Sequence, residues 1–85
     1  GAGYKGKAIA RMLQEGSLSF YWLCDNPKKI GKRIYNIPME HFSQLDRLKN
    51  PQSIVTVANA GAQKEIRGFL GCREQREGTD YHFFC

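Results

Sequence analysis

Residues 1–6 read GAGYKG, a Gly-x-Gly-x-x-Gly pattern, and apolar residues at helical spacing follow it directly. In a dinucleotide-binding turn, Gly1 permits the tight turn, Gly3 lets the backbone approach a pyrophosphate, and Gly6 lets the helix pack closely on its strand. The N-terminus of that helix offers free N–H groups and a partial positive charge to phosphates. Two alternatives are a chance match in a chain with nine glycines, and a cloning scar at residues 1–2.

In the rest of the chain, segments with the apolar spacing of helices alternate with short apolar runs typical of strands. Helices are predicted over residues 5–15, 39–48 and 62–70, strands over residues 20–24, 54–58 and 81–84, and a short extended piece over residues 34–37. Alternation of helices with short apolar strands is typical of a parallel sheet flanked by helices. We therefore expect one α/β domain over residues 1–85, a Rossmann-like doubly wound parallel sheet that lacks its first strand. That strand would lie between residues 20–24 and 54–58.

An acidic residue follows the glycine turn at the spacing that the nucleotide-binding pattern requires. Asp25 lies 19 positions after Gly6, at the end of the apolar run FYWLC, where a carboxylate can bind ribose hydroxyls. The alternative is that Asp25 only starts an Asx-type turn before Pro27. With Asp25, we expect Tyr4, Lys5, Asn26 and Lys28 to contact the ligand.

Asn59 follows the second predicted strand in the sequence ANAGAQ. Ligands of doubly wound sheets bind beyond the carboxyl ends of the strands, so Asn59 is a further candidate for ligand binding. Capping the next helix is the commoner role for asparagine at such a position.

The formal net charge is +5, and four of the basic residues fall in the sequence KKIGKR at residues 28–33. An excess of basic residues suits the binding of a phosphorylated small molecule, an anionic membrane face or nucleic acid. The basic run is either a solvated loop or a contact for a 2′-phosphate, which would favour NADP. Nucleic-acid binding is the weaker hypothesis, because most aromatic residues fall in predicted strands and are expected in the core.

Other classes of function find little support. The three cysteines are odd in number and lack a Cys-x-x-Cys spacing, which favours reduced thiols in a cytoplasmic protein and no metal site. No apolar run approaches the roughly 20 residues of a membrane span. No catalytic set is suggested by spacing, so a binding module is expected and any enzymatic activity stays open.

The sequences GAGYKGKAIA, CDNPKKIGKRIYNIPM and IVTVANAGAQKEI resemble a Rossmann-like module of bacterial surface-polysaccharide biosynthesis proteins. Similar modules begin nucleotide-sugar dehydratases, epimerases and sugar O-acyltransferases, and accompany glycosyltransferases. Asn36 stands where glycine is usual in this phrase. The resemblance covers nearly the whole chain and implies binding of a nucleotide, NAD(P) or a nucleotide-sugar. It also allows a structural or oligomerisation module, paired with itself or with an enzyme domain, that has lost its ligand. Such a module is expected to be part of a longer protein.

Overall fold

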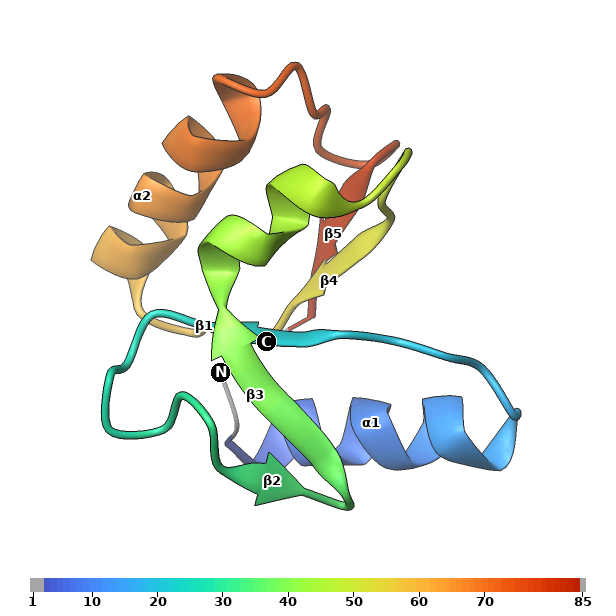
Figure 1. The fold of residues 1–85 in the computed structure, drawn as a ribbon. Coiled ribbons are helices and arrows are strands. Elements are labelled where there is room, and N and C mark those ends of the chain that lie inside the picture. The colour runs from blue at the N-terminus through green and yellow to red at the C-terminus, as the bar shows by residue number, and fades with distance from the viewer. Residues whose placement is uncertain (1–2, 85) are drawn as a thin grey trace.

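The computed structural model describes residues 3–84, which form two small sheets with helices packed against them. Figure 1 shows α1, β1, β2 and β3 in one part of the molecule, and η1, β4, α2 and β5 in the other. In chain order, the elements are α1 (Tyr4–Glu15), β1 (Trp22–Cys24), β2 (Arg33–Ile34), β3 (Ile37–His41), the 3₁₀ helix η1 (Phe42–Arg47), β4 (Ser53–Val55), α2 (Ala60–Gly71) and β5 (Tyr81–Phe83).

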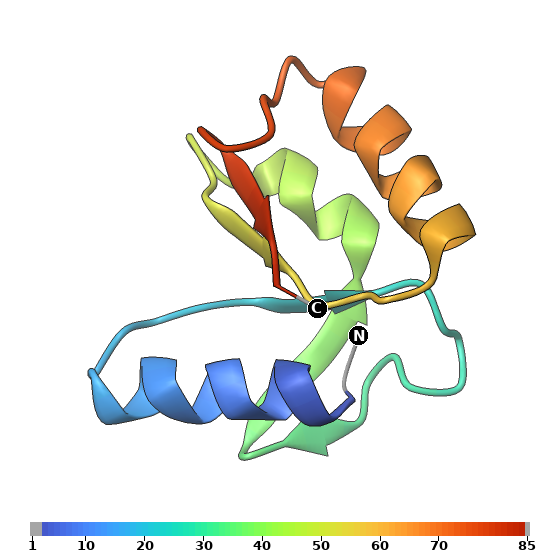
Figure 2. The same cartoon turned by 180° about the vertical axis from the view of Figure 1, so that it is seen from behind.

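The strand β1 is covered on both of its faces, as its continuous apolar run predicts. Trp22 belongs to a core cluster with Ala10 of α1 and Met39 of β3. Leu23, on the opposite face, packs against a second cluster that contains Leu70 of α2. One strand therefore links the two hydrophobic cores, and Figure 2 shows α1 on one side of it and α2 on the other.

The prediction of a helix over residues 39–48 is wrong in its first part. Tyr35 and Asn36 have φ angles of 52° and 65°, the signs that a two-residue type I′ hairpin turn requires. The turn pairs Ile34 with Ile37, so β3 is an extended strand that pairs antiparallel with β2. Pro38 lies inside this strand.

The predicted doubly wound parallel sheet is also wrong. In residues 3–84 the first sheet has the order β1-β3-β2, with β1 parallel and β2 antiparallel to β3, and β4 pairs only with β5. Alternation of helices and strands predicts which elements exist, but it does not determine which strands share hydrogen bonds. Here β1 and β4 stand at the edges of separate sheets, and the chain forms a small mixed α/β fold.

The predicted extended piece over residues 34–37 is wrong in its middle, because residues 35–36 form the turn between β2 and β3. Two of the predicted helices and the three predicted strands are confirmed with shifted ends. Helices α1 and α2 and the strands β1, β4 and β5 all lie where the apolar periodicity indicates them. None of the helices in the described range has the length and the apolar content to cross a membrane.

Candidate functional site

The N-terminus of α1 has no side-chain cap. Gly3 is the N-cap residue, and the first backbone bond of the helix joins the N–H of Lys7 to the carbonyl of Gly3 at 3.0 Å. The N–H groups of Tyr4, Lys5 and Gly6 lie ahead of this bond and have no partner within the helix. Such groups are donors for an anion, and the helix dipole adds partial positive charge there.

The two glycines of the motif that the structure describes have different environments. Gly6 is buried in the first turn of α1, whereas Gly3 is exposed at its start. Gly1 lies outside the described residues.

The first turn of α1 lies beside the ends of β4 and β5. The ammonium nitrogen of Lys5 is 5.9 Å from the ring centroid of Phe84, which directly follows β5. The backbone N–H of Phe84 donates to the carbonyl of Val55, the last residue of β4, at 2.7 Å. Both views of the fold also place the start of α1 on the side where β1 ends. The start of α1 and the carboxyl ends of three strands therefore lie in one region.

The loop after β1 carries the predicted ribose contact. Asp25 is exposed, and the turn that follows is begun by Asn26, whose Oδ1 accepts a hydrogen bond from the N–H of Lys28 at 3.0 Å. The carbonyl of Asn26 also accepts from the N–H of Lys29 at 2.9 Å. Asn26 thus uses its side-chain oxygen to shape the loop, and Asp25 and Lys28 have exposed side chains.

Asn59 acts as a helix cap. Its Oδ1 accepts a hydrogen bond from the N–H of Ala62 at 2.9 Å, at the start of α2. This is the capping role that the sequence gives as the alternative to ligand binding. The two long helices therefore differ, because α2 has a side-chain cap and α1 has none.

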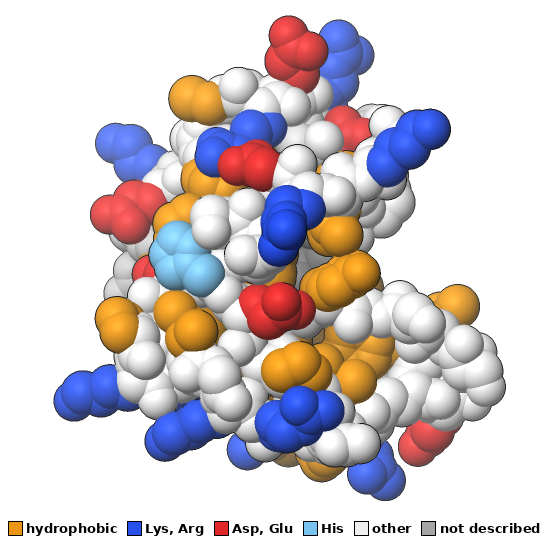
Figure 3. Space-filling view, in the orientation of Figure 1, with side chains coloured by type: hydrophobic (Ala, Val, Ile, Leu, Met, Phe, Trp, Pro, Cys, Tyr) orange, Lys and Arg blue, Asp and Glu red, His pale blue; other side chains and the backbone are white. Residues whose placement is uncertain are grey.

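Exposed basic side chains lie on α1, on the loop before β2 and at the start of β2. Figure 3 shows Lys and Arg side chains along the lower edge of the molecule, where Figure 1 places α1 and the loop before β2. The exposed basic residues of these two segments are Lys5, Lys7, Arg11, Lys28, Lys29 and Lys32, and Arg33 follows as the first residue of β2. Their charge adds to the positive potential at the start of α1.

Most of the aromatic residues lie in the core, as expected from the sequence. Four rings are exposed by more than a third of their surface, namely Tyr4, Tyr21, Tyr35 and Phe84. The other six are buried or half-buried. Five of them belong to or pack against the two core clusters, and the sixth, Phe42, contacts Phe69 edge to face. The exposed rings are spread over four segments and do not follow one basic groove.

The two acidic residues with shifted pKa values are not at the start of α1. The guanidinium of Arg73 lowers the pKa of Asp46 by a side-chain hydrogen bond, and Arg67 acts in the same way on Glu77. Among residues 3–84, no group of three His, Cys, Asp or Glu side chains lies close enough to hold a metal ion. Both described cysteines, Cys24 and Cys72, are free thiols. The groups that the start of α1 offers to a ligand are its backbone N–H donors and basic side chains, which suit an anion.

Comparison with protein-family models, with curated proteins and with solved structures found no match to this chain. Its function has to be argued from its own geometry.

One feature of the structure has no signal in the sequence motifs. A pocket lies between η1, with its connection to β4, and the connection from α2 to β5. It is lined by Leu45, Asp46, Leu48, Pro51, Arg73 and Gln75. These residues come from segments far apart in the chain and match no spacing rule. Asp46 and Arg73, which form an ion pair in the pocket wall, are 27 residues apart, and the sequence alone does not indicate that they meet.

Proposed function

We propose that the chain binds a phosphorylated ligand, a nucleotide, NAD(P) or a nucleotide-sugar, at the N-terminus of α1. The observation that carries the proposal is the uncapped first turn of α1, which begins at a glycine beside the carboxyl ends of the strands. The resemblance to modules of polysaccharide biosynthesis supports the same ligand class and a cytoplasmic location.

Each group has a specific role in this proposal. The N–H groups of Tyr4, Lys5 and Gly6 donate to phosphate oxygens, and the ammonium groups of Lys5 and Lys7 add charge. Asp25 accepts from ribose hydroxyls, while Lys28 neutralises a further phosphate. Asn26 and Asn59 hold the flanking turns through their own hydrogen bonds. The role is binding, and no bond-making step is assigned.

The substitution Gly3→Asp tests the proposal at the helix N-terminus. An aspartate at this N-cap accepts hydrogen bonds from the first turn and repels phosphate, while it leaves α1 at least as stable. Lys49→Gln is the matched control, because it lowers the net charge by the same one unit at an exposed position after η1.

Thermal unfolding with NAD⁺, NADP⁺, coenzyme A and UDP-glucose gives the readout. A ligand at 100 times its Kd stabilises the folded state by about 2.7 kcal/mol, which raises the Tm of a domain of this size by roughly 10 °C or more. We expect that shift in the parent protein and in Lys49→Gln, and its loss in Gly3→Asp. If no nucleotide raises the Tm, or if Gly3→Asp responds like the parent, the proposal is wrong.

A second candidate function is association with another copy or with an enzyme domain. It is favoured by the outer edges of β1 and β4, which belong to separate sheets in the described chain, and by Ile54 of β4, which is 47% exposed. Sheet edges of this kind pair readily with other chains. Light scattering after size exclusion should show an oligomer that Ile54→Lys dissociates. A monomer at every concentration would exclude self-association.

A further inference from the structure

The positive charge is concentrated in one of the two parts of the molecule. Residues 1–41 hold seven basic and three acidic residues, whereas residues 42–85 hold six and five. The first of these ranges contains α1 and the three strands of the first sheet. The ion pairs Arg67–Glu77 and Arg73–Asp46 both lie in the second range. Most of the excess charge therefore belongs to α1 and the first sheet, where acidic side chains are few.

Four exposed basic residues of this part lie outside the proposed phosphate site. They are Arg11 of α1, Lys29 and Lys32 of the loop before β2, and Arg33 of β2, and we call them the basic face. No ion pair within residues 3–84 involves any of them. Figure 3 shows basic side chains along the edge of the molecule where Figure 1 places α1 and this loop. Like charges that no acidic group of the described chain neutralises favour an anionic partner.

The helix and the hairpin of the basic face are in direct contact. The guanidinium of Arg11 lies 5.0 Å from the ring centroid of Tyr35, and Nε2 of Gln14 donates to the carbonyl of Tyr35 at 2.9 Å. Arg33 contacts the same turn, because its Nη2 donates to the carbonyl of Asn36 at 3.0 Å. Arg11 and Arg33 therefore both contact the β2–β3 turn, so a partner that reaches one of them lies close to the other.

Apolar side chains are exposed among these charges. Ile30, in the loop before β2, is 37% exposed, and Tyr35 is 38% exposed. Tyr4 lies seven residues before Arg11, hence on the same side of α1, and is 89% exposed. Of the eight large apolar side chains that are exposed by more than a third in the described chain, six belong to residues 4–35. Aliphatic and tyrosine side chains between basic ones are typical of a surface that lies on a membrane.

A nucleic acid would use this face less well than a membrane. Single-stranded nucleic acid stacks its bases on exposed aromatic rings. One side of the Tyr35 ring is covered by the guanidinium of Arg11, and Ile30 has no ring on which a base could stack. An anionic membrane attracts the same basic side chains and also buries the exposed part of Ile30.

We propose that the basic face binds the surface of a membrane that contains anionic lipids. The four basic side chains contact the headgroup phosphates, and Ile30 and Tyr35 enter the boundary between headgroups and acyl chains. The proposal does not depend on nucleotide binding, because none of these side chains takes part in the phosphate site at the start of α1.

Sedimentation with lipid vesicles tests the proposal. Vesicles of phosphatidylcholine mixed with phosphatidylglycerol, whose headgroup carries a net negative charge, should bind the protein, and vesicles of phosphatidylcholine alone should not. The double variant Lys29→Gln with Lys32→Gln should bind the anionic vesicles roughly 25-fold more weakly, about fivefold for each basic residue near the surface. Lys49→Gln with Lys64→Gln removes the same charge at exposed positions of the other part and should bind nearly as tightly as the parent.

Ile30→Gln separates a membrane from a nucleic acid, because it keeps the charge and removes an apolar side chain. Binding to the anionic vesicles should fall roughly three- to tenfold in this variant, and binding to a DNA duplex, titrated in parallel, should not change. All the substituted side chains are exposed, so each variant should melt near the parent temperature, which checks its folding. Equal binding of the parent to both kinds of vesicle, equal losses in the two double variants, unchanged vesicle binding of Ile30→Gln, or binding to the duplex alone would overturn the proposal.

Discussion

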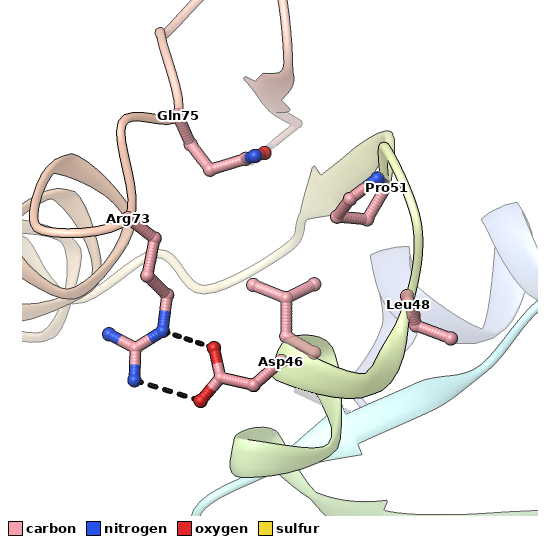
Figure 4. A pocket seen from close by; sticks show the side chains of 6 residues that line it. Asp46, Leu48, Pro51, Arg73 and Gln75 are labelled. Carbon is pink, nitrogen blue, oxygen red and sulfur yellow. Dashed lines mark hydrogen bonds and ion pairs between the residues drawn. The ribbon is translucent and has the colours of Figure 1, made fainter.

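Arg73 holds Asp46 through two parallel hydrogen bonds, at 2.6 and 3.2 Å, and so joins the end of α2 to η1. The same guanidinium lies 3.5 Å from the ring centroid of Phe69. A bidentate arginine stacked on an aromatic ring has little freedom to reorient. This arrangement fixes one wall of the pocket that contains Gln75, as Figure 4 shows.

The first prediction concerns the pH dependence of this ion pair. The hydrogen bond from Arg73 lowers the pKa of Asp46 below its ordinary value of 3.8. Because the pKa is lower in the folded state than in the unfolded state, the carboxylate stabilises the fold above that ordinary value, and the contribution is lost as the pH falls through the folded-state pKa. Asp46→Asn should therefore lower the Tm slightly at neutral pH, and this loss should become smaller as the pH falls below the ordinary value of 3.8 and through the folded-state pKa.

The control for this prediction is Arg73→Lys, which keeps the positive charge and loses the bidentate geometry. Its Tm should respond to pH less steeply than that of the parent. Added salt should reduce the effect of Asp46→Asn, because both side chains are partly exposed. A difference in Tm between parent and Asp46→Asn that persists unchanged in acid would contradict the assignment.

The second prediction concerns the turn between β2 and β3. Asn36 has a φ of 65°, and its Oδ1 and carbonyl both accept hydrogen bonds from Arg33. Asparagine tolerates this left-handed conformation, whereas a β-branched residue does not. Asn36→Val should lower the free energy of unfolding by about 1–2 kcal/mol, measured by urea denaturation. Asn36→Gly should be close to the parent, and equal losses in both variants would contradict the turn assignment.

The third prediction concerns the cap of α2. Asn59→Ala removes the acceptor for the N–H of Ala62 and should lower the free energy of unfolding by about 0.5–2 kcal/mol. Asn59→Asp keeps an acceptor and should retain most of the stability. Circular dichroism during urea denaturation provides the measurement. If alanine and aspartate are equally tolerated, the cap contributes nothing to stability.

The elements of this fold could be predicted from the sequence where one local pattern decides them. The run FYWLC predicts β1 because both faces of that strand are buried, and the stripe of apolar residues predicts α1. Phe42, Leu45 and Leu48 are three residues apart, a spacing that fits a 3₁₀ helix of three residues per turn as well as an α-helix. The structure has the 3₁₀ helix η1 over Phe42–Arg47.

Pairing between strands could not be predicted in the same way. The hairpin depends on positive φ angles at Tyr35 and Asn36. The sequence Asn-Gly is the common signal for such a turn, and this chain has Tyr-Asn at these two positions. The glycine motif correctly indicated the start of α1, because the start of a helix depends on residues that are neighbours in the chain. The pocket at Gln75 depends on contacts such as Arg73 with Asp46, which are 27 residues apart, and local spacing carries no information about them.

The last prediction concerns the core between α1 and the first sheet. Met39 is 1% exposed and belongs to the cluster that joins β3, β1 and α1, whereas Met12 of α1 is 66% exposed. Met39→Ala should lower the free energy of unfolding by about 2–5 kcal/mol, because it removes buried apolar contacts and leaves a cavity. Met12→Ala, the same chemical change at the surface, should stay within about 0.5 kcal/mol of the parent. Urea denaturation of the two variants measures both values, and similar losses at the two positions would show that α1 does not pack on β3 as described.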